Sequence, residues 1–482
     1  MTDATPYGEW PSPLSSERLT GGGMGLAGVH AGDRAWWLER RADDGGRGVL
    51  VREGPDGPVD VTPPGYDVRT RVHEYGGGDF AVHEGTVWFA NDDDQRLYRQ
   101  RPDGEPEPVT PEPAVERGDR YADLDRAPDG TLYGVRERHG GADGPTNGLV
   151  ALPEEGDGEP RVVAEGHDFY SSPRVSPDGD RLAWLAWDHP AMPWDATTLY
   201  VADRDGIGLA DERAIAGGPA SVERRTGSGD AADARGESLF GPSWGPDGDL
   251  HVVSDRTGWW NLYRLDGDDL AACYPDEREW GVPAWRLGAA TYAVLDDGRV
   301  VAAVGGESEY RLGLLEDGTF EDLGLPFADV EPTLHTDGES VLFVAAGPTR
   351  PPSVVRWAPG EGSEIVFESV DRPLDAPYVS EPEHVAFPTG EGGEETAHAL
   401  YYPPRNPGAT APGGERPPLV VRVHGGPTGE SRTGLSVRSG SGLPPIQYLT
   451  TRGIAVADVN YRGSAGYGRA YRDRLKGEWG LV

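Results

Sequence analysis

Residues 421–429 read VRVHGGPTG, so a short apolar run ends in a histidine and two consecutive glycines. Such a loop could serve acyl-transfer chemistry, in which negative charge builds on a carbonyl oxygen and fixed backbone N–H groups stabilise it. Glycine suits this task because a side chain on the loop would block the approach of that oxygen. Taken in isolation, the pattern fits a structural tight turn equally well. The segment is therefore a candidate oxyanion loop, and a nucleophile must be sought elsewhere.

A serine nucleophile for this chemistry sits in a Gly-x-Ser-x-Gly elbow, a sharp turn between a strand and a helix. Four serines are plausible, and each has a residue other than glycine two positions away: Ser464 follows Arg462, Ser441 follows Ser439, Ser228 follows Thr226, and Ser436 precedes Arg438. None of these four serines completes the elbow.

Metal-assisted chemistry has no support in the sequence. Cys273 is the single cysteine, so neither an intrachain disulfide nor a thiolate cluster can form. The eleven histidines show neither an HExxH pair nor another metal-ligand spacing. We therefore expect no metal site.

The elements around the candidate loop indicate the start of a parallel α/β sheet. Residues 418–424 predict a short buried strand, residues 443–452 a short helix, and residues 453–460 a second apolar strand. Strand, crossover and strand in this order are typical of a parallel sheet. Residues 461–468 (YRGSAGYG) would leave the sheet at its carboxyl edge, where α/β sites lie, and residues 469–476 predict one or two helical turns.

Repeats occupy most of the preceding chain. A turn ending in glycine, followed by a β-rich run, recurs seven times, as in APDGTLYGVRE (127–137) and GPDGDLHVVSD (245–255). The turn glycines are Gly32, Gly85, Gly130, Gly179, Gly248, Gly298 and Gly338, at spacings of 53, 45, 49, 69, 50 and 40 residues. This period is typical of a four-stranded propeller blade, and Asp-Gly supplies the positive φ that a tight hairpin needs. We predict seven blades over about residues 20–370, with an insertion near 204–237; a pair of β-sandwiches is the alternative.

The chain resembles the prolyl oligopeptidase family of serine peptidases, especially its acylaminoacyl-peptidase and dipeptidyl-peptidase-like branches. The resemblance covers nearly the whole chain and rests on the seven repeats, the joining segment EPEHVAFPTGEGGEETAHALYYPPRNP (381–407), VHGGPTG and DVNYRGSAGYG (458–468). It implies a mostly β fold with three parts: a seven-bladed β-propeller at 1–370, a linker and extended segment at 371–416, and at 417–482 the incomplete start of an α/β-hydrolase domain, the N-terminal part of the peptidase catalytic domain.

The resemblance implies a serine-type peptidase. A histidine-activated serine would attack an acyl carbonyl of a short peptide substrate, and water would hydrolyse the acyl-enzyme. The propeller would cap the hydrolase domain and act as a substrate gate that admits only short peptides. No metal or organic cofactor is implied. A non-catalytic propeller module that binds a peptide or a protein, and a propeller-fused esterase, remain alternatives, because a propeller by itself fixes no function.

Residue by residue, the resemblance assigns the oxyanion-stabilising N–H to Gly426, with His424 and Gly425 shaping the loop. His424 is not the catalytic histidine, which in this family follows the serine. Arg462 is expected to anchor the loop. The nucleophilic serine, the aspartate and the histidine are expected beyond Val482. The chain by itself is thus predicted to be a catalytically incomplete N-terminal fragment, or the product of a truncated or frameshifted gene.

The charge balance is strongly acidic. There are 82 acidic and 44 basic side chains, a formal net charge of -38, and Lys476 is the single lysine. We interpret this as adaptation to a cytoplasm rich in salt, where screening reduces self-repulsion of the surface. So acidic a surface excludes nucleic acid as a partner. Neither a signal peptide nor an apolar run of membrane-spanning length is found, so we expect a soluble cytoplasmic protein with no membrane contact.

Two propeller segments could also face a ligand. They are 71–77 (RVHEYGG), where Glu74 could meet a substrate amine, and 256–260 (RTGWW), which contains Trp259. Both segments fit strand-end turns and blade-packing aromatics as well, so the roles of Glu74 and Trp259 stay open. Peptide length, the side chain preferred at the scissile bond, endopeptidase or exopeptidase mode and oligomeric state also stay open.

Overall fold

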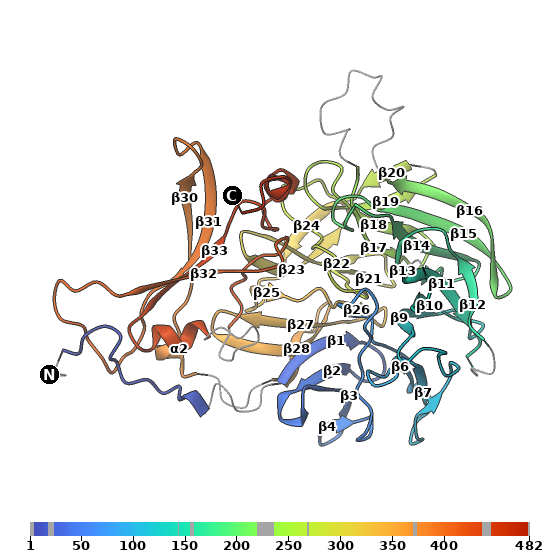
Figure 1. Ribbon diagram of the computed structural model, residues 1–482, viewed down its shortest axis with the longest axis horizontal. Coiled ribbons are helices and arrows are strands. Elements are labelled where there is room, and N and C mark those ends of the chain that lie inside the picture. The colour runs from blue at the N-terminus through green and yellow to red at the C-terminus, as the bar shows by residue number, and fades with distance from the viewer. Residues whose placement is uncertain are drawn as a thin grey trace.

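The computed structural model describes residues 4–17, 24–142, 144–154, 159–218, 236–267, 269–369, 374–435 and 445–480. Figure 1 shows a ring of small sheets, which holds most of the chain, and beside it a separate sheet built from the last strands. Among the described residues strands dominate, and the helices are short. None of these helices is both long and apolar enough to cross a membrane.

Seven consecutive blades form the ring, which confirms the predicted seven-bladed propeller. Blades 1 to 3 comprise β1 (Met24–His30), β2 (Trp36–Arg41), β3 (Arg47–Gly54), β4 (Gly57–Asp60); β5 (Phe80–His83), β6 (Thr86–Ala90), β7 (Leu97–Gln100), β8 (Glu107–Pro108); and β9 (Asp119–Arg126), β10 (Leu132–Arg138), β11 (Thr146–Leu152), β12 (Arg161–Ala164). Blades 4 and 5 comprise β13 (Phe169–Val175), β14 (Arg181–Trp187), β15 (Thr198–Asp205), β16 (Gly208–Gly217); and β17 (Leu239–Trp244), β18 (Leu250–Ser254), β19 (Asn261–Asp266), β20 (Asp269–Ala272). Blades 6 and 7 comprise β21 (Tyr292–Val294), β22 (Val300–Gly306), β23 (Glu309–Glu316), β24 (Thr319–Asp322); and β26 (His335–Thr336), β27 (Val341–Gly347), β28 (Arg350–Ala358), β29 (Gly362–Glu368). The short strand β25 (Asp329–Val330) pairs with β23 and β27 and so joins the last two blades.

All seven predicted turn glycines lie between the first and second strands of a blade. Six of them have a positive φ, from 75° at Gly85 to 96° at Gly338, and Gly32 does not. The Gly130 amide donates to the Ala127 carbonyl (2.9 Å), which closes a four-residue turn with glycine at its last position. The glycines that recur in the sequence therefore mark the turn between the first and second strands of each blade.

The predicted insertion at 204–237 is partly wrong. Residues up to Gly217 belong to β15 and to the ten-residue β16, the last two strands of blade 4. A long spacing between turn glycines cannot distinguish a lengthened hairpin from an inserted loop, and the hairpin takes up much of the interval. Residues 219–235 lie outside the described part of the chain.

Large buried side chains hold neighbouring blades together. Trp88 of blade 2, for example, packs with Tyr121 and Leu132 of blade 3. Trp37 of blade 1 packs in one cluster with Val344 of blade 7, and β1 contacts β27 and β28. Since the first and last blades are held by apolar burial and share no sheet, the hydrophobic effect closes the ring.

The separate sheet has the strand order β30 (Glu383–Thr389), β31 (Glu395–Tyr402), β33 (Ala455–Asn460), β32 (Leu419–Val423). β32 and β33 run parallel, with α2 (Ile446–Thr450) in the crossover, which confirms the predicted start of an α/β sheet. β31 pairs antiparallel with β33, so part of the predicted linker at 371–416 belongs to this sheet. The division of the chain at residues 370 and 416 remains a prediction.

Two local predictions in this region need correction. The helix predicted at 443–452 is shorter, because Pro445 is extended (ψ 146°) and precedes the first helical residue. The strand predicted to be buried is exposed, since Leu419 is 55% and Val421 59% accessible. Its apolar side chains have no cover among the described residues because α2 packs over β31 and β33, and no core cluster includes a side chain of β32. Residues 469–476 do form helical turns, namely α3 (Arg469–Arg472) and the 3-10 turn η5 (Asp473–Leu475).

Candidate functional site

The loop at 424–429 and the segment at 461–466 leave the sheet side by side. The loop follows β32 and the segment follows β33, and because these two strands are parallel, both leave at the same edge. The amide of Ala465 donates to the Gly429 carbonyl (2.8 Å), which ties the two together. The sequence placed both segments at this edge, and the structure brings them into contact.

Three consecutive carbonyls of the loop each accept a hydrogen bond from a different segment. The Tyr461 hydroxyl donates to the Pro427 carbonyl (3.0 Å). The indole N–H of Trp285, a propeller residue, donates to the Thr428 carbonyl. With the bond from Ala465 to Gly429, the carbonyl side of the loop is fixed from three directions.

The backbone N–H groups at the start of the loop donate no hydrogen bond within the described part of the chain. Within the described part of the chain, the N–H groups of Gly425 and Gly426 donate to no protein acceptor, and both glycines are exposed. Gly426 has a φ of +137°, which L side chains rarely adopt, and a Cβ added at Gly425 would meet open space. An N–H group without a protein acceptor is available to a substrate oxygen. The assignment of that role to Gly426 stays a prediction.

His424 and Ser464 form a pair that could be mistaken for a catalytic dyad. His424 Nε2 lies 2.8 Å from Ser464 Oγ, and the imidazole stacks on the Tyr461 ring with 4.6 Å between centroids. Burial lowers the pKa of His424. Ser464 is completely buried, so its hydroxyl has no access to a substrate. The pair joins the loop to the 461–466 segment, and the supporting role of His424 stays a prediction.

The remaining candidate residues are less informative. Ser228, Ser436 and Ser441 lie outside the described residues. Arg462, predicted to anchor the loop, forms an ion pair with Glu395 of β31, and Arg474 pairs with the same carboxylate (3.1 Å). The Arg462 contact is what an anchoring residue needs.

Blade 5 and the segment that follows it bind the chain just after the candidate site. Glu279, fully buried, accepts the Gly468 amide (3.0 Å) and the Trp260 amide (3.1 Å), and burial raises its pKa to about 7. Asp255 forms ion pairs with both Arg469 and Arg472 (2.7 Å each). These contacts fix α3, and with it the end of the 461–468 segment, against the propeller.

Blades 6 and 7 contribute a second set of contacts. Arg432 pairs with Glu430 (3.2 Å) and with Asp329 of the propeller (3.4 Å), and its guanidinium lies 4.0 Å from the centroid of the Tyr310 ring. Its pKa is raised by the surrounding acidic groups, of which Glu430 is the strongest, against the opposing effect of burial. The chain following the loop is thus anchored by a buried charge cluster.

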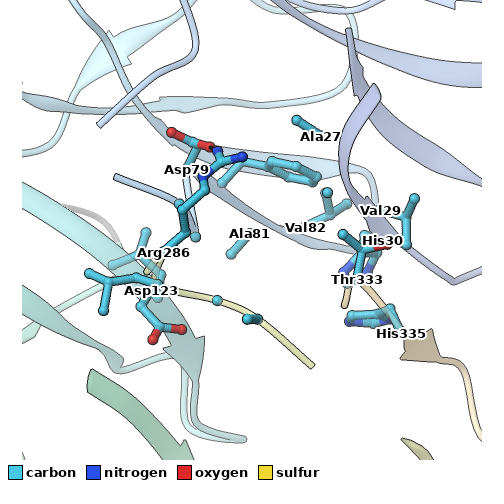
Figure 2. Close-up of a pocket in the computed structure, with 18 of the residues that line it drawn as sticks. Ala27, Val29, His30, Asp79, Ala81, Val82, Asp123, Arg286, Thr333 and His335 are labelled. Atoms are coloured by element: carbon cyan, nitrogen blue, oxygen red, sulfur yellow. Dashed lines mark ion pairs between the residues drawn. The ribbon is translucent and has the colours of Figure 1, made fainter. Parts of the chain in front are cut away.

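A cavity of about 410 Å³ lies on the propeller axis, lined by the innermost segments of six blades. Figure 2 shows His30 and His335 together on one side and Arg286 reaching toward Asp79 on the other. The two imidazole rings are 4.1 Å apart, and burial, together with His335, lowers the pKa of His30 to about 2. Arg286 lies 3.6 Å from Asp79. The axial cavity therefore has both charged and apolar side chains in its lining.

The two propeller residues left open by the sequence lie in different places. The Glu74 carboxylate is 70% exposed and pairs with Arg120 (2.7 Å), which lowers its pKa. Trp259 covers Gly468, where an added Cβ would lie 3.1 Å from the indole. It also lines a cavity of about 420 Å³ between the propeller and the separate sheet, with Tyr467 and Tyr471. Within the described part of the chain, no hydrogen bond or ion pair joins either side chain to the 424–429 loop.

Sequence reasoning missed Trp285, the propeller residue that contacts the loop directly. Trp285 lies in an irregular segment between β20 and β21 and belongs to no repeat unit. Its partner in the loop is 143 residues away along the chain. The only signal nearby was the 71–77 segment, whose Tyr75 ring packs on Trp285 with 5.1 Å between centroids.

Comparisons with known proteins agree with this arrangement. The model of the prolyl oligopeptidase family matches residues 444–482. A Mycobacterium tuberculosis puromycin-hydrolyzing peptidase of known structure is 38% identical, with a TM-score of 0.89, and the match covers 99% of this chain and 72% of that one. A second solved structure, a puromycin hydrolase, is 35% identical with a TM-score of 0.88 and the same coverage.

Curated relatives match over shorter stretches. Dipeptidyl peptidase family member 6 of Caenorhabditis elegans is 34% identical over 96 residues, which is 17% of this chain and 12% of the relative. The chain thus matches about an eighth of that relative's length.

Proposed function

The chain belongs to the prolyl oligopeptidase family of peptidases, and on that premise we propose that it carries the propeller and one half of the catalytic site of a serine-type peptidase that cleaves short peptides. One observation supports this most directly. The carbonyls of residues 427–429 are all held by hydrogen bonds, while the amides of Gly425 and Gly426 are left uncommitted.

In this proposal a histidine-activated serine attacks the acyl carbonyl, and the Gly426 N–H stabilises the oxyanion that forms. The N–H of the residue after the nucleophile would be the second donor. Water then hydrolyses the acyl-enzyme. Ser464 is buried and paired with His424, so the serine, aspartate and histidine are sought beyond Val482. The 482-residue chain alone is then expected to be inactive.

The propeller acts in this proposal as a gate for substrates. Its axial cavity of about 410 Å³ has room for a short peptide and none for a folded protein, and its lining is polar at His30, Asp79 and Arg286. The similar Mycobacterium tuberculosis protein is a puromycin-hydrolyzing peptidase, so puromycin is a candidate substrate once the catalytic residues are supplied.

Two assays test the proposal. The 482-residue chain alone should not hydrolyse peptide amides. Hydrolysis that a serine-directed phosphonate blocks would overturn the view that the nucleophile is absent. A chimera that joins this chain to the part of the Mycobacterium tuberculosis peptidase that it does not match should hydrolyse peptide amides, and the phosphonate should abolish this activity. An elbow serine to alanine variant of the chimera is the control. Faster turnover of p-nitrophenyl esters than of any peptide would favour an esterase.

A further inference from the structure

Trp285 connects the candidate loop to two other aromatic side chains of the propeller. Its indole N–H donates to the Thr428 carbonyl, and its ring packs against Trp194 (4.4 Å between centroids) and Tyr75 (5.1 Å). Trp194 is buried, with 6% of its surface accessible, whereas Tyr75 is 59% accessible. In this aromatic cluster Trp194 is therefore buried in the core, Trp285 contacts the loop, and the Tyr75 ring is exposed.

The backbone that carries Tyr75 packs closely against two other segments. The carbonyl of Gly76 accepts the Leu287 amide (2.9 Å), so the 71–77 segment is docked on the segment that carries Trp285. Gly76 and Gly77 have φ values of +65° and +95°. A Cβ would lie 2.2 Å from the Thr70 carbonyl at Gly76 and 2.3 Å from the Leu287 carbonyl at Gly77, so neither glycine can be replaced without a backbone shift. Tyr75 is thus held in place beside Trp285 while its ring stays uncovered.

The charges on the same segment are already paired. Arg71 forms an ion pair with Asp92 (2.7 Å), and Glu74 forms one with Arg120 (2.7 Å). A charged ligand group would have to compete with these partners. The exposed feature that remains free is the aromatic surface, which favours a planar, uncharged ring through offset or edge-to-face stacking.

We propose that Tyr75 and Trp285 form an aromatic subsite beside the oxyanion loop, and that this subsite binds the aromatic side chain of an amino-acid amide or short peptide. The inference rests on the proposed function, since it names the substrate class of the same site. In this inference the propeller selects an aromatic side chain of the substrate, at a position separated from the loop by the Trp285 indole.

Binding to the 482-residue chain tests the subsite without any need for hydrolysis. Isothermal titration calorimetry would compare L-phenylalaninamide with L-cyclohexylalaninamide, which has a ring of similar size but no π-electrons. The aromatic amide should bind about three- to tenfold more tightly, the range that a stacking contact provides. Tyr75→Ala should remove this preference, and Tyr75→Phe should keep it because the ring remains.

Trp479→Ala is the matched control, because Trp479 is an exposed aromatic (73% accessible) outside the cluster and its loss should leave both affinities unchanged. Thermal melts of all variants check folding, which a substitution at the exposed Tyr75 should not disturb.

The inference would be overturned by equal affinities for the two amides, by an unchanged preference in Tyr75→Ala, or by the absence of measurable binding. None of these results bears on the proposed function, which is decided by phosphonate-sensitive hydrolysis in the chimera. Conversely, the chain could show an aromatic preference that depends on Tyr75 while the chimera hydrolyses nothing. That result would support the aromatic subsite and overturn the proposed peptidase function.

Discussion

Gly426 combines a φ of +137° with an exposed amide that no described residue accepts. These two properties belong together, because the unusual backbone angle sets the direction of the N–H and only glycine adopts that angle readily. Gly429, three residues later, has an ordinary φ, and an added Cβ there would make normal contacts at 3.7 and 3.8 Å. Gly426 and Gly429 therefore differ in whether their backbone can accept a residue with a side chain.

Gly426→Ala in the active chimera should lower kcat about 100-fold with a smaller change in KM, because alanine disfavours the φ of +137° and would turn the N–H away from the oxyanion, which weakens binding of the transition state more than that of the substrate. Steady-state kinetics on a peptide amide measures this. Gly429→Ala is the control and should retain most activity, because an alanine fits its backbone and its space. Equal losses in both variants would mean that the loop is merely fragile.

At the scale of elements, the loop depends on pieces that are far apart in the chain. β33 is followed by Tyr461 and Ala465, which hold two loop carbonyls, and the segment before β21 supplies Trp285 for the third. Blade 5 then grips α3 through Asp255. The geometry of the loop is therefore set jointly by the separate sheet and the propeller.

Trp285→Phe should loosen the loop, because phenylalanine keeps a ring for packing but cannot donate to the Thr428 carbonyl. Hydrogen exchange measured by mass spectrometry should show faster exchange in peptides that contain the hydrogen-bonded amides of Gly429 and Ser431. Trp259→Phe is the matched control, since Trp259 lies at the same boundary without bonding to the loop. Identical exchange in the two variants would show that the indole N–H does not hold the loop.

Asp255→Ala should destabilise the junction between blade 5 and α3 by about 3 kcal/mol or more, because it removes the buried carboxylate that pairs with both Arg469 and Arg472. Urea unfolding measures the change. Asp249→Ala, which removes a pair with Arg264 that is about half exposed on both sides, should cost less than about 1 kcal/mol. If Asp255→Ala lowered the free energy of unfolding no more than Asp249→Ala, Asp255 would not be the main ionic contact between blade 5 and α3.

At the scale of the whole molecule, the acidic net charge is the main feature, and we expect it to make stability depend on salt. A formal net charge of -38 over 482 residues makes the surface repel itself at low ionic strength. Salt shortens the range of this repulsion, from about 10 Å at 0.1 M to about 3 Å at 1 M. The origin of the chain in a salt-rich cytoplasm remains a prediction that rests on this balance and on the single lysine.

The thermal midpoint of the chain should therefore rise when KCl is increased from about 0.1 M to about 1 M, a range over which screening becomes short compared with the spacing of surface charges. Differential scanning calorimetry measures the shift. Sucrose at matched osmolality is the control for effects of solute other than screening. A midpoint that stays constant or falls with KCl would refute the adaptation to salt.

Much of the fold could be predicted because its signals are local. Turn glycines such as Gly130 and Gly298 mark hairpins through their own backbone angles, and the apolar run at 453–460 marked β33 by its composition. The exposure of β32 could not be predicted in this way. An apolar run predicts a buried strand whatever lies beside it, and only the tertiary structure shows that α2 covers β31 and β33 while Leu419 and Val421 of β32 stay exposed.

By itself, the sequence determined the seven repeats, the parallel strand pair and the two glycines of the loop, since turn geometry and side-chain alternation depend on neighbours in the chain. The tertiary structure decided that Ser464 is buried against His424, that β31 pairs with β33, and that Trp285 bonds to the loop. Each of these facts joins residues at least 40 positions apart. Contacts at such separations follow from how complete elements pack, which no short stretch of sequence encodes.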